Sequence, residues 1–184
     1  MDSSGNLKDE VGRIHIYEGE GKGKTTAAVG LAVRFAGTGG NVLFTQFLKK
    51  NDSGELKILI GIPNVELILC EQNFGFTFQM TPERKQEAAA YYSGHLSRVL
   101  AAAKQMEGRS LLVLDEILAA YNQNMVRQQE LLDFLREKPE NLEIVLTGRN
   151  PAPELSAFAD YITAMEKKKH PFDNGVPARQ GIEW

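Results

Sequence analysis

Short apolar runs alternate along the chain with longer segments of mixed polarity, which predicts strands that alternate with helices. The apolar runs are rich in Val, Ile and Leu and lack a clear two-residue alternation, as is typical of strands buried on both faces. They cover residues 13–17, 42–47, 65–70, 111–114, 144–147 and 161–165. We therefore expect six strands in one sheet.

Segments between these runs carry the end signals of helices, and they cover residues 24–37, 81–108 and 124–138. Glycines at 37–40 end the first, where a left-handed cap is favoured. Thr81 and Pro82 begin the second, because a hydroxyl residue followed by proline is typical of a helix start. Pro139 ends the third.

Alternating strands and helices with right-handed crossovers predict a mostly parallel six-stranded sheet covered by helices on both faces, a three-layer α/β fold. A chain of 184 residues is long enough for one domain with a substantial core and short for two. We read residues 1–12 as a flexible polar tail and residues 13–184 as a single domain.

The composition excludes several classes of protein. Lys and Arg number 21 against 24 Asp and Glu, and a net charge of −3 disfavours a sequence-tolerant nucleic-acid binder. The single cysteine, Cys70, excludes an internal disulfide and fits a reducing compartment. No segment resembles a secretion signal, and no apolar run approaches the ~20 residues that span a bilayer. We expect a cytoplasmic protein that binds neither nucleic acid nor membrane.

The strongest chemical signal is a glycine-rich loop between a predicted strand and a predicted helix. It reads Gly19-Glu20-Gly21-Lys22-Gly23-Lys24-Thr25-Thr26. Glycines let several N–H groups point into one concavity, and the helix N-terminus adds positive potential at the same place. Lys24 would contact phosphate oxygens, and the Thr25 hydroxyl would bind Mg²⁺.

Two acidic residues depart from the usual phosphate-loop pattern. Glu18 stands where a glycine is usual, and Glu20 lies within the loop, so both weaken the local field unless they point away. The alternative is a glycine-rich turn without a ligand. It is disfavoured because Gly-Lys-Thr-Thr in this context has few other uses.

A second signal is the apolar run 111–114 that ends in Asp115 and Glu116. Carboxylates at the carboxyl end of a parallel strand are placed to bind Mg²⁺ or Mn²⁺, directly or through water. Alone the pattern is common, but with the phosphate loop it predicts a site for a nucleoside triphosphate and its metal. Weaker candidates at the same edge are Gln46, Lys49 and Arg149, each at or just after the carboxyl end of a predicted strand.

The segment 17–28 resembles the phosphate loop of ATP:corrinoid adenosyltransferases of the CobA (BtuR/CobO) type. Further segments resemble that family in the same order along the chain. They are 46–49, 75–78, 113–116, 147–149, 169–176 and 181–184. Together they extend the resemblance from about Arg13 to the last residue.

This resemblance implies a RecA-like sheet, a homodimer and a transfer reaction. The 5′-deoxyadenosyl group of ATP would move to the Co(I) of a reduced corrinoid, with release of tripolyphosphate, in adenosylcobalamin biosynthesis or salvage. A flavoprotein is the implied reductant. ATP would be bound by residues 19–26 and Arg149, with Lys24, Thr25 and Glu116 as the catalytic residues and Thr25, Asp115 and Glu116 as the metal ligands.

The same resemblance assigns Phe76 and Phe78 to the corrinoid pocket, where apolar rings can displace the axial base of the cobalt. The alternative is that the rings of the stretch 74–78 pack onto the core. Phe78 stands where the family often has Trp.

Two other functions are compatible with a phosphate loop. One is a RecA-like ATPase that hydrolyses ATP to ADP and phosphate, with Glu116 polarising water. The other is a nucleotide sensor without enzymatic activity. The aromatic stretch and the C-terminal segments favour the adenosyltransferase, and the acidic net charge disfavours a nucleic-acid motor.

Overall fold

The computed structural model describes residues 11–75 and 77–183. Within these residues six strands form one sheet in the order β3-β2-β4-β5-β1-β6, and every neighbouring pair is parallel. The strands are β1 Ile14–Glu18, β2 Asn41–Gln46, β3 Val65–Leu67, β4 Ser110–Asp115, β5 Leu142–Thr147 and β6 Tyr161–Ala164. The expected parallel, six-stranded sheet is confirmed.

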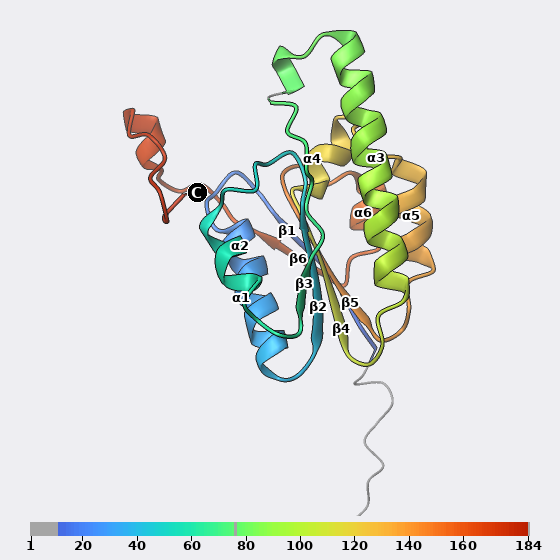
Figure 1. Cartoon of the computed structure of the whole chain (residues 1–184). Coiled ribbons are helices and arrows are strands. Elements are labelled where there is room, and N and C mark those ends of the chain that lie inside the picture. The colour runs from blue at the N-terminus through green and yellow to red at the C-terminus, as the bar shows by residue number, and fades with distance from the viewer. Residues whose placement is uncertain (1–10, 76, 184) are drawn as a thin grey trace, which may run out of the picture.

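Helices cover both faces of this sheet, which gives the expected three layers (Figure 1). On one face lie α1 (Lys24–Gly37) and α2 (Gly54–Leu59). On the other lie α3 (Pro82–Lys104), α4 (Ile117–Asn122), α5 (Gln128–Arg136) and α6 (Pro153–Ser156).

Strand β4 shows why the apolar runs lack alternation. Leu111 and Val113 belong to the core beneath α1, whereas Leu112 and Leu114 belong to the core beneath α3. Every residue of β4 is buried, because each of its two faces is covered by a helical layer. A strand in the middle of such a sheet needs apolar side chains at successive positions.

The predicted helix 124–138 is wrong in its boundaries. The structure has α4 directly after β4 and α5 from Gln128, with Asn124 in a left-handed conformation (φ 54°) between them. The short helices α2 and α6 were not predicted. Two other elements are shorter than expected, since α3 ends at Lys104 instead of Gly108 and β3 ends at Leu67 instead of Cys70.

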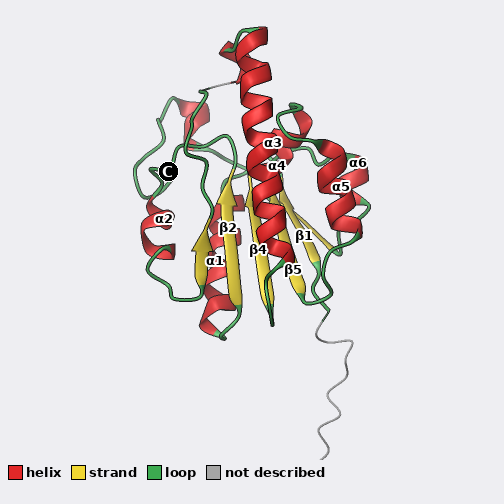
Figure 2. Cartoon of the chain, turned by 45° about the vertical axis from the view of Figure 1, so that its right-hand side comes forward, coloured by secondary structure: helices red, strands yellow, loops and turns green. Residues whose placement is uncertain are grey.

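The parallel arrangement brings the carboxyl ends of the strands to one edge of the sheet (Figure 2). The loop from β1 to α1, the segment after β6 and the first turns of α3 lie toward this edge (Figure 1). Ligands of open parallel sheets bind at this edge. We therefore expect a ligand site at this edge of the sheet.

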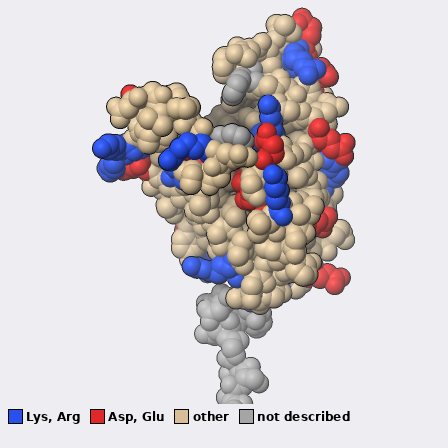
Figure 3. Space-filling view, turned by 60° about the vertical axis from the view of Figure 1, so that its left-hand side comes forward, with Lys and Arg blue, Asp and Glu red and all other residues tan. Residues whose placement is uncertain are grey.

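The surface carries mixed charges. On the face seen in Figure 3, Lys and Arg side chains are interspersed with Asp and Glu, without a continuous basic surface. No helix within residues 11–75 and 77–183 is long and apolar enough to cross a membrane.

His95 of α3 is buried in the core and contributes to stability in a pH-dependent way. Its Nδ1 accepts a hydrogen bond from Arg98 (3.0 Å), so its Nε2–H donates to the Thr45 hydroxyl (2.8 Å). A protonated ring would turn a second N–H toward the guanidinium. Burial, and then the charge of Arg98, lower the pKa of His95 from 6.5 to about 4.

We expect the free energy of unfolding to fall as the pH is lowered from 6.5 to about 4, because the unfolded chain then binds a proton that folded His95 does not. The loss should reach about 3 kcal/mol, since one pKa unit corresponds to about 1.4 kcal/mol. Urea unfolding across this range measures it. His95→Gln should flatten the slope, and an unchanged slope in that variant would contradict the prediction.

Candidate active site

The loop between β1 and α1 has the shape of a phosphate-binding loop. Gly23 has φ 120°, a conformation that residues with a side chain rarely adopt. Gly21 donates its N–H to the Met165 carbonyl (2.6 Å), and a Cβ on Gly21 would lie 2.4 Å from that oxygen. The chain after β6 therefore supports the loop from behind, and the loop can bend tightly into the start of α1.

Lys24, the first residue of α1, directs its side chain back over this loop. Its Nζ donates to the carbonyl oxygens of Gly19 (2.7 Å) and Gly21 (2.9 Å), and the residue is buried. Burial lowers the pKa of the ammonium, and the Glu116 carboxylate opposes this shift. The cation is held by neutral carbonyl groups alone at the position where a phosphate would bind.

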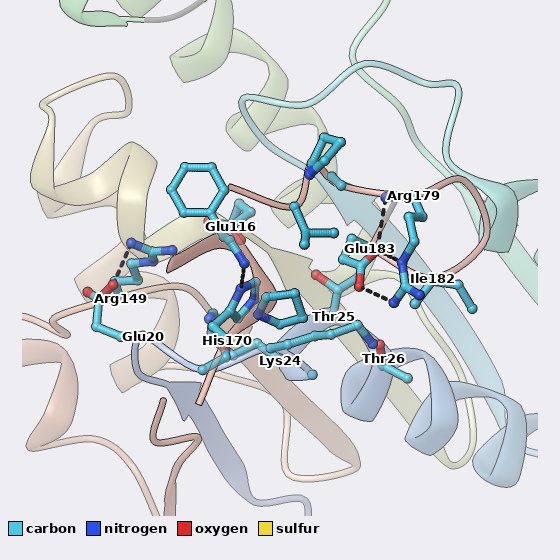
Figure 4. Close-up of a pocket in the computed structure, with 18 of the residues that line it drawn as sticks. Glu20, Lys24, Thr25, Thr26, Glu116, Arg149, His170, Arg179, Ile182 and Glu183 are labelled. Carbon is cyan, nitrogen blue, oxygen red and sulfur yellow. Dashed lines mark hydrogen bonds and ion pairs between the residues drawn. The ribbon is translucent and has the colours of Figure 1, made fainter. Parts of the chain in front are cut away.

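The acidic residue inside the loop, Glu20, lines a cavity at the phosphate loop and is paired with a cation. A carboxylate oxygen of Glu20 pairs with a guanidinium nitrogen of Arg149 at 2.6 Å, and both side chains are more than half exposed (Figure 4). An exposed pair of this kind contributes little to stability. Arg149 thus lies beside Glu20 in the wall of the cavity, and its role toward a phosphate stays a prediction.

Asp115, at the end of β4, is fully buried and connects several elements at this edge. Its Oδ1 accepts hydrogen bonds from the hydroxyls of Thr25 (2.9 Å) and Thr147 (2.7 Å). Its Oδ2 accepts from Gln46 (3.2 Å) and from the Lys49 ammonium (2.6 Å). One carboxylate therefore joins α1 to the ends of β2, β4 and β5.

Glu116 follows Asp115 but lies in a different environment. Its φ of 60° is left-handed, which is unusual for a residue with a side chain, and its N–H donates to the Thr147 hydroxyl (2.9 Å). Burial, and then the Asp115 carboxylate, raise the pKa of Glu116. The Glu116 side chain lines the cavity at the phosphate loop.

The side chains at the start of α1 and at the carboxyl end of β4 fit a hard divalent cation. Thr25, Asp115 and Glu116 offer one hydroxyl and two carboxylates, and Mg²⁺ is commonly held by one or two carboxylates together with substrate phosphates. Among the described residues no group of three or more His, Cys, Asp or Glu side chains forms a metal cage. The Lys49 ammonium, 2.9 Å from the Thr25 hydroxyl, shows that the position already accommodates positive charge.

A cavity of about 310 Å³ lies between the phosphate loop and the C-terminal segment 170–183 (Figure 4). No residue of that segment was a site candidate from the sequence. Its Arg179 pairs with Glu183 at 2.9 Å, and both residues line the cavity opposite Lys24 and Thr25. The wall of the cavity therefore comes from both ends of the chain.

A second cavity, of about 850 Å³, adjoins the first. The residues that line both cavities are Thr25, Thr26, Lys49, Ile182 and Glu183. The rest of the wall comes largely from residues 48–55 and from Ile58 of α2, together with Asn73 and Gly75. Thr25, Thr26 and Lys49 were site candidates from the sequence, and the other residues of this wall were not.

The aromatic stretch 74–78 divides into different environments. Phe74 is buried and packs against Tyr91 and Tyr92, with ring centroids 5.5 and 5.7 Å away. Phe78, in the short helix η2 (Thr77–Gln79), is 78% exposed and is not among the residues that line either cavity. Phe76 lies outside the described residues. Packing onto the core is thus correct for Phe74 and wrong for Phe78.

Comparison with known proteins gives a family and a fold. The family model described as ATP:corrinoid adenosyltransferase BtuR/CobO/CobP matches residues 10–184. A corrinoid adenosyltransferase of Sinorhizobium sp is 34% identical over 181 residues, which is 96% of this chain and 82% of that protein. Those of Escherichia coli K12 and Salmonella typhimurium LT2, the latter called CobA, are each 32% identical over 96% of this chain and 88% of theirs.

Two solved structures that resemble this chain are ATPases. One contains ATPases 2 and 3 of EssC from Geobacillus thermodenitrificans, with a TM-score of 0.54 and 13% identity over 94% of this chain and 36% of that one. Another is the cytoplasmic domain of the type VII secretion ATPase EccC of Thermomonospora curvata. Its TM-score is 0.50, with 12% identity over 90% of this chain and 21% of that one. At these identities the likeness concerns the fold alone.

Asp115→Asn should destabilise the protein by about 1–3 kcal/mol, the usual effect of leaving buried polar groups poorly paired, because it turns an amide toward hydrogen-bond donors and removes the charge that pairs with Lys49. Urea unfolding measures the loss. Glu116→Gln is the matched control and should lose much less, since the Glu116 side chain faces the cavity. Equal losses in the two variants would contradict the role given to Asp115.

Proposed function

This chain belongs to the ATP:corrinoid adenosyltransferase family, and from that premise we propose how its own residues serve the reaction of the family. The protein is an ATP-using transferase that moves the 5′-deoxyadenosyl group of ATP to the cobalt of a corrinoid. The observation that favours transfer over simple hydrolysis is the pair of adjoining cavities, which share Thr25 and Lys49 in their walls.

The polyphosphate of ATP would bind in the loop formed by residues 19–26. Backbone N–H groups at the start of α1 favour an anion there. A phosphate can replace the carbonyl groups that hold Lys24 and can draw Arg149 from Glu20, because neither contact is a buried ion pair. Lys22, exposed near the tip of the loop, would add charge at the rim.

Thr25, Asp115 and Glu116 would hold Mg²⁺ or Mn²⁺ beside these phosphates. When bound, the metal would neutralise part of the charge on the leaving triphosphate. Thr25 lies on α1, Asp115 is the last residue of β4, and Glu116 lies between β4 and α4. A desolvated carboxylate such as Glu116 interacts more strongly with a cation than an exposed one does.

The protein need not supply a nucleophile or a general base. The electron pair of Co(I) in the substrate attacks C5′ of ATP, the C5′–O bond breaks, and its electrons leave with the tripolyphosphate. Burial raises the pKa of the Cys70 thiol to about 12, so this thiol is unsuited to act as a nucleophile. The protein's task is to position C5′ and to stabilise the leaving group.

The corrinoid would occupy the second cavity. A volume of about 850 Å³ lies within the range of small-molecule sites, about 300–1,000 Å³. Asn73 and Gly75, which flank Phe74, line this cavity. Phe76 and Phe78 are proposed to contact the corrinoid there, and the 78% exposure of Phe78 leaves most of its ring accessible to a large substrate.

The cellular setting is also proposed. The single cysteine and the family favour the cytoplasm, with a flavoprotein as electron donor. A homodimer would have an apolar edge available for contact, because Tyr161 and Ile162 of the edge strand β6 are both more than half exposed.

Mixing the protein with Mg-ATP and chemically reduced cobalamin should give light-sensitive adenosylcobalamin and tripolyphosphate, followed by absorbance and phosphate analysis. Lys24→Ala should lower the rate at least about a hundredfold, the usual effect of losing one preorganised contact to developing charge. Lys22→Ala is the matched control and should lose less, since its side chain is exposed. ADP and orthophosphate as products, with unchanged cobalamin, would support the ATPase instead.

Phe78→Ala should impair the reaction with Co(II)-derived corrinoid more than the reaction with preformed Co(I). The physical reason is that an apolar ring helps to remove the axial base, which makes cobalt easier to reduce. Parallel assays with an enzymatic reductant and with chemically produced Co(I) measure the difference. Equal losses in both assays would mean that the ring has a structural role alone.

A further inference from the structure

The ammonium of Lys49 lies where a metal would bind. Its Nζ is 2.6 Å from Oδ2 of Asp115 and 2.9 Å from Oγ1 of Thr25. Asp115 and Thr25, to which these oxygens belong, are two of the three proposed metal ligands. The lysine side chain is 30% exposed, so it can leave this position without unfolding the core, whereas Asp115 is fully buried.

The backbone before Lys49 is held in an unusual shape that aims the side chain at these oxygens. Leu48 has φ 55°, a conformation that is uncommon for a residue with a branched side chain. The preceding residue, Phe47, is buried and donates its N–H to the backbone carbonyl of Asp115 (2.9 Å). Backbone strain of this kind is typical of functional sites. Here it turns the chain at the end of β2 back toward Asp115.

An ammonium group and a divalent cation cannot share these oxygens. A metal bound by Thr25 and Asp115 needs the lone pairs that accept from Lys49, and the positive charges would repel each other at close range. We propose that the Lys49 ammonium occupies the metal position in the metal-free enzyme and that metal binding displaces it. This inference rests on the proposed metal ligation by Thr25 and Asp115.

The exchange links metal binding to the nucleotide. Without a nucleotide, Lys49 compensates the buried Asp115 and competes with free metal ions. A nucleotide brings phosphate ligands that complete the coordination of the metal, so the metal then competes successfully. The displaced ammonium remains in the wall between the two cavities, since Lys49 lines both. Lys49 is thus a positioning residue that favours joint binding of metal and ATP.

The test is Mn²⁺ binding by nucleotide-free protein, followed by the electron paramagnetic resonance signal of free Mn²⁺. Lys49→Met removes the competing charge and should bind Mn²⁺ about tenfold more tightly than the unaltered protein, within the usual range of coupling between two ligands. Lys57→Met, which removes an exposed lysine on α2, is the charge-matched control and should match the unaltered protein.

A second measurement separates competition from a purely structural ion pair. Mn²⁺ should raise the melting temperature of Lys49→Met more than that of the unaltered protein, because the metal replaces the missing partner of Asp115. Lys49→Gln, which keeps a hydrogen-bond donor without the charge, should give the same result. It serves as a second variant if Lys49→Met folds poorly.

Each outcome decides the inference. If both lysine variants bind Mn²⁺ no more tightly than the unaltered protein, while adding Thr25→Val weakens their binding, the displacement idea is wrong and the metal site stands. If Thr25→Val leaves Mn²⁺ binding unchanged in the Lys49→Met background, the metal does not bind here. In that case the metal ligation proposed above fails together with the inference.

Discussion

The buried carboxylate of Asp115 is the interaction on which the arrangement of the site depends. It receives Thr25 from the first helix, Thr147 from β5, Gln46 from β2 and Lys49 from the loop that follows. A buried charge is tolerated only with close partners, and these partners come from segments far apart in the sequence. Satisfying one carboxylate thus fixes the phosphate loop relative to the ends of three strands.

Three cationic side chains of the site are each oriented by a specific contact. Lys24 is held by backbone carbonyls, Arg149 by the exposed Glu20, and Lys49 by groups that also suit a metal. Each contact orients its side chain. In the proposed reaction Lys24 and Arg149 exchange their partners for a phosphate, and a metal takes the place of the Lys49 ammonium. Preorganised charges of this kind need little rearrangement when negative charge develops on the leaving group.

The sequence was sufficient for the parts of the site that follow from local chain geometry. A phosphate loop requires glycines and a helix start in one short segment, and parallel strands require apolar runs that end together. The walls of the cavities could not be predicted in the same way. Arg179 and Glu183 reach the loop only because the chain returns after β6, and no local pattern signals that return.

Individual side chains and turns show the same limit. Phe74 and Phe78 have the same sequence neighbourhood, yet one packs against Tyr91 and Tyr92 and the other is exposed. Helix α4 escaped prediction because it is only six residues long and begins two residues after the end of β4. The left-handed turns at Leu48 and Glu116 carry no sequence signal, since neither residue type favours that conformation.

The same physical property could make Glu116 a base for hydrolysis or a ligand for a metal. Burial raises its pKa, so its carboxylate gains from either a proton or a cation. With a metal bound, the lone pairs of the carboxylate are engaged and proton abstraction from water is disfavoured. Under the proposed assignment, a corrinoid in the second cavity would keep water away from C5′ and bring its own nucleophile, which favours transfer. A phosphate loop thus serves transfer when the space beside it is built for a second substrate.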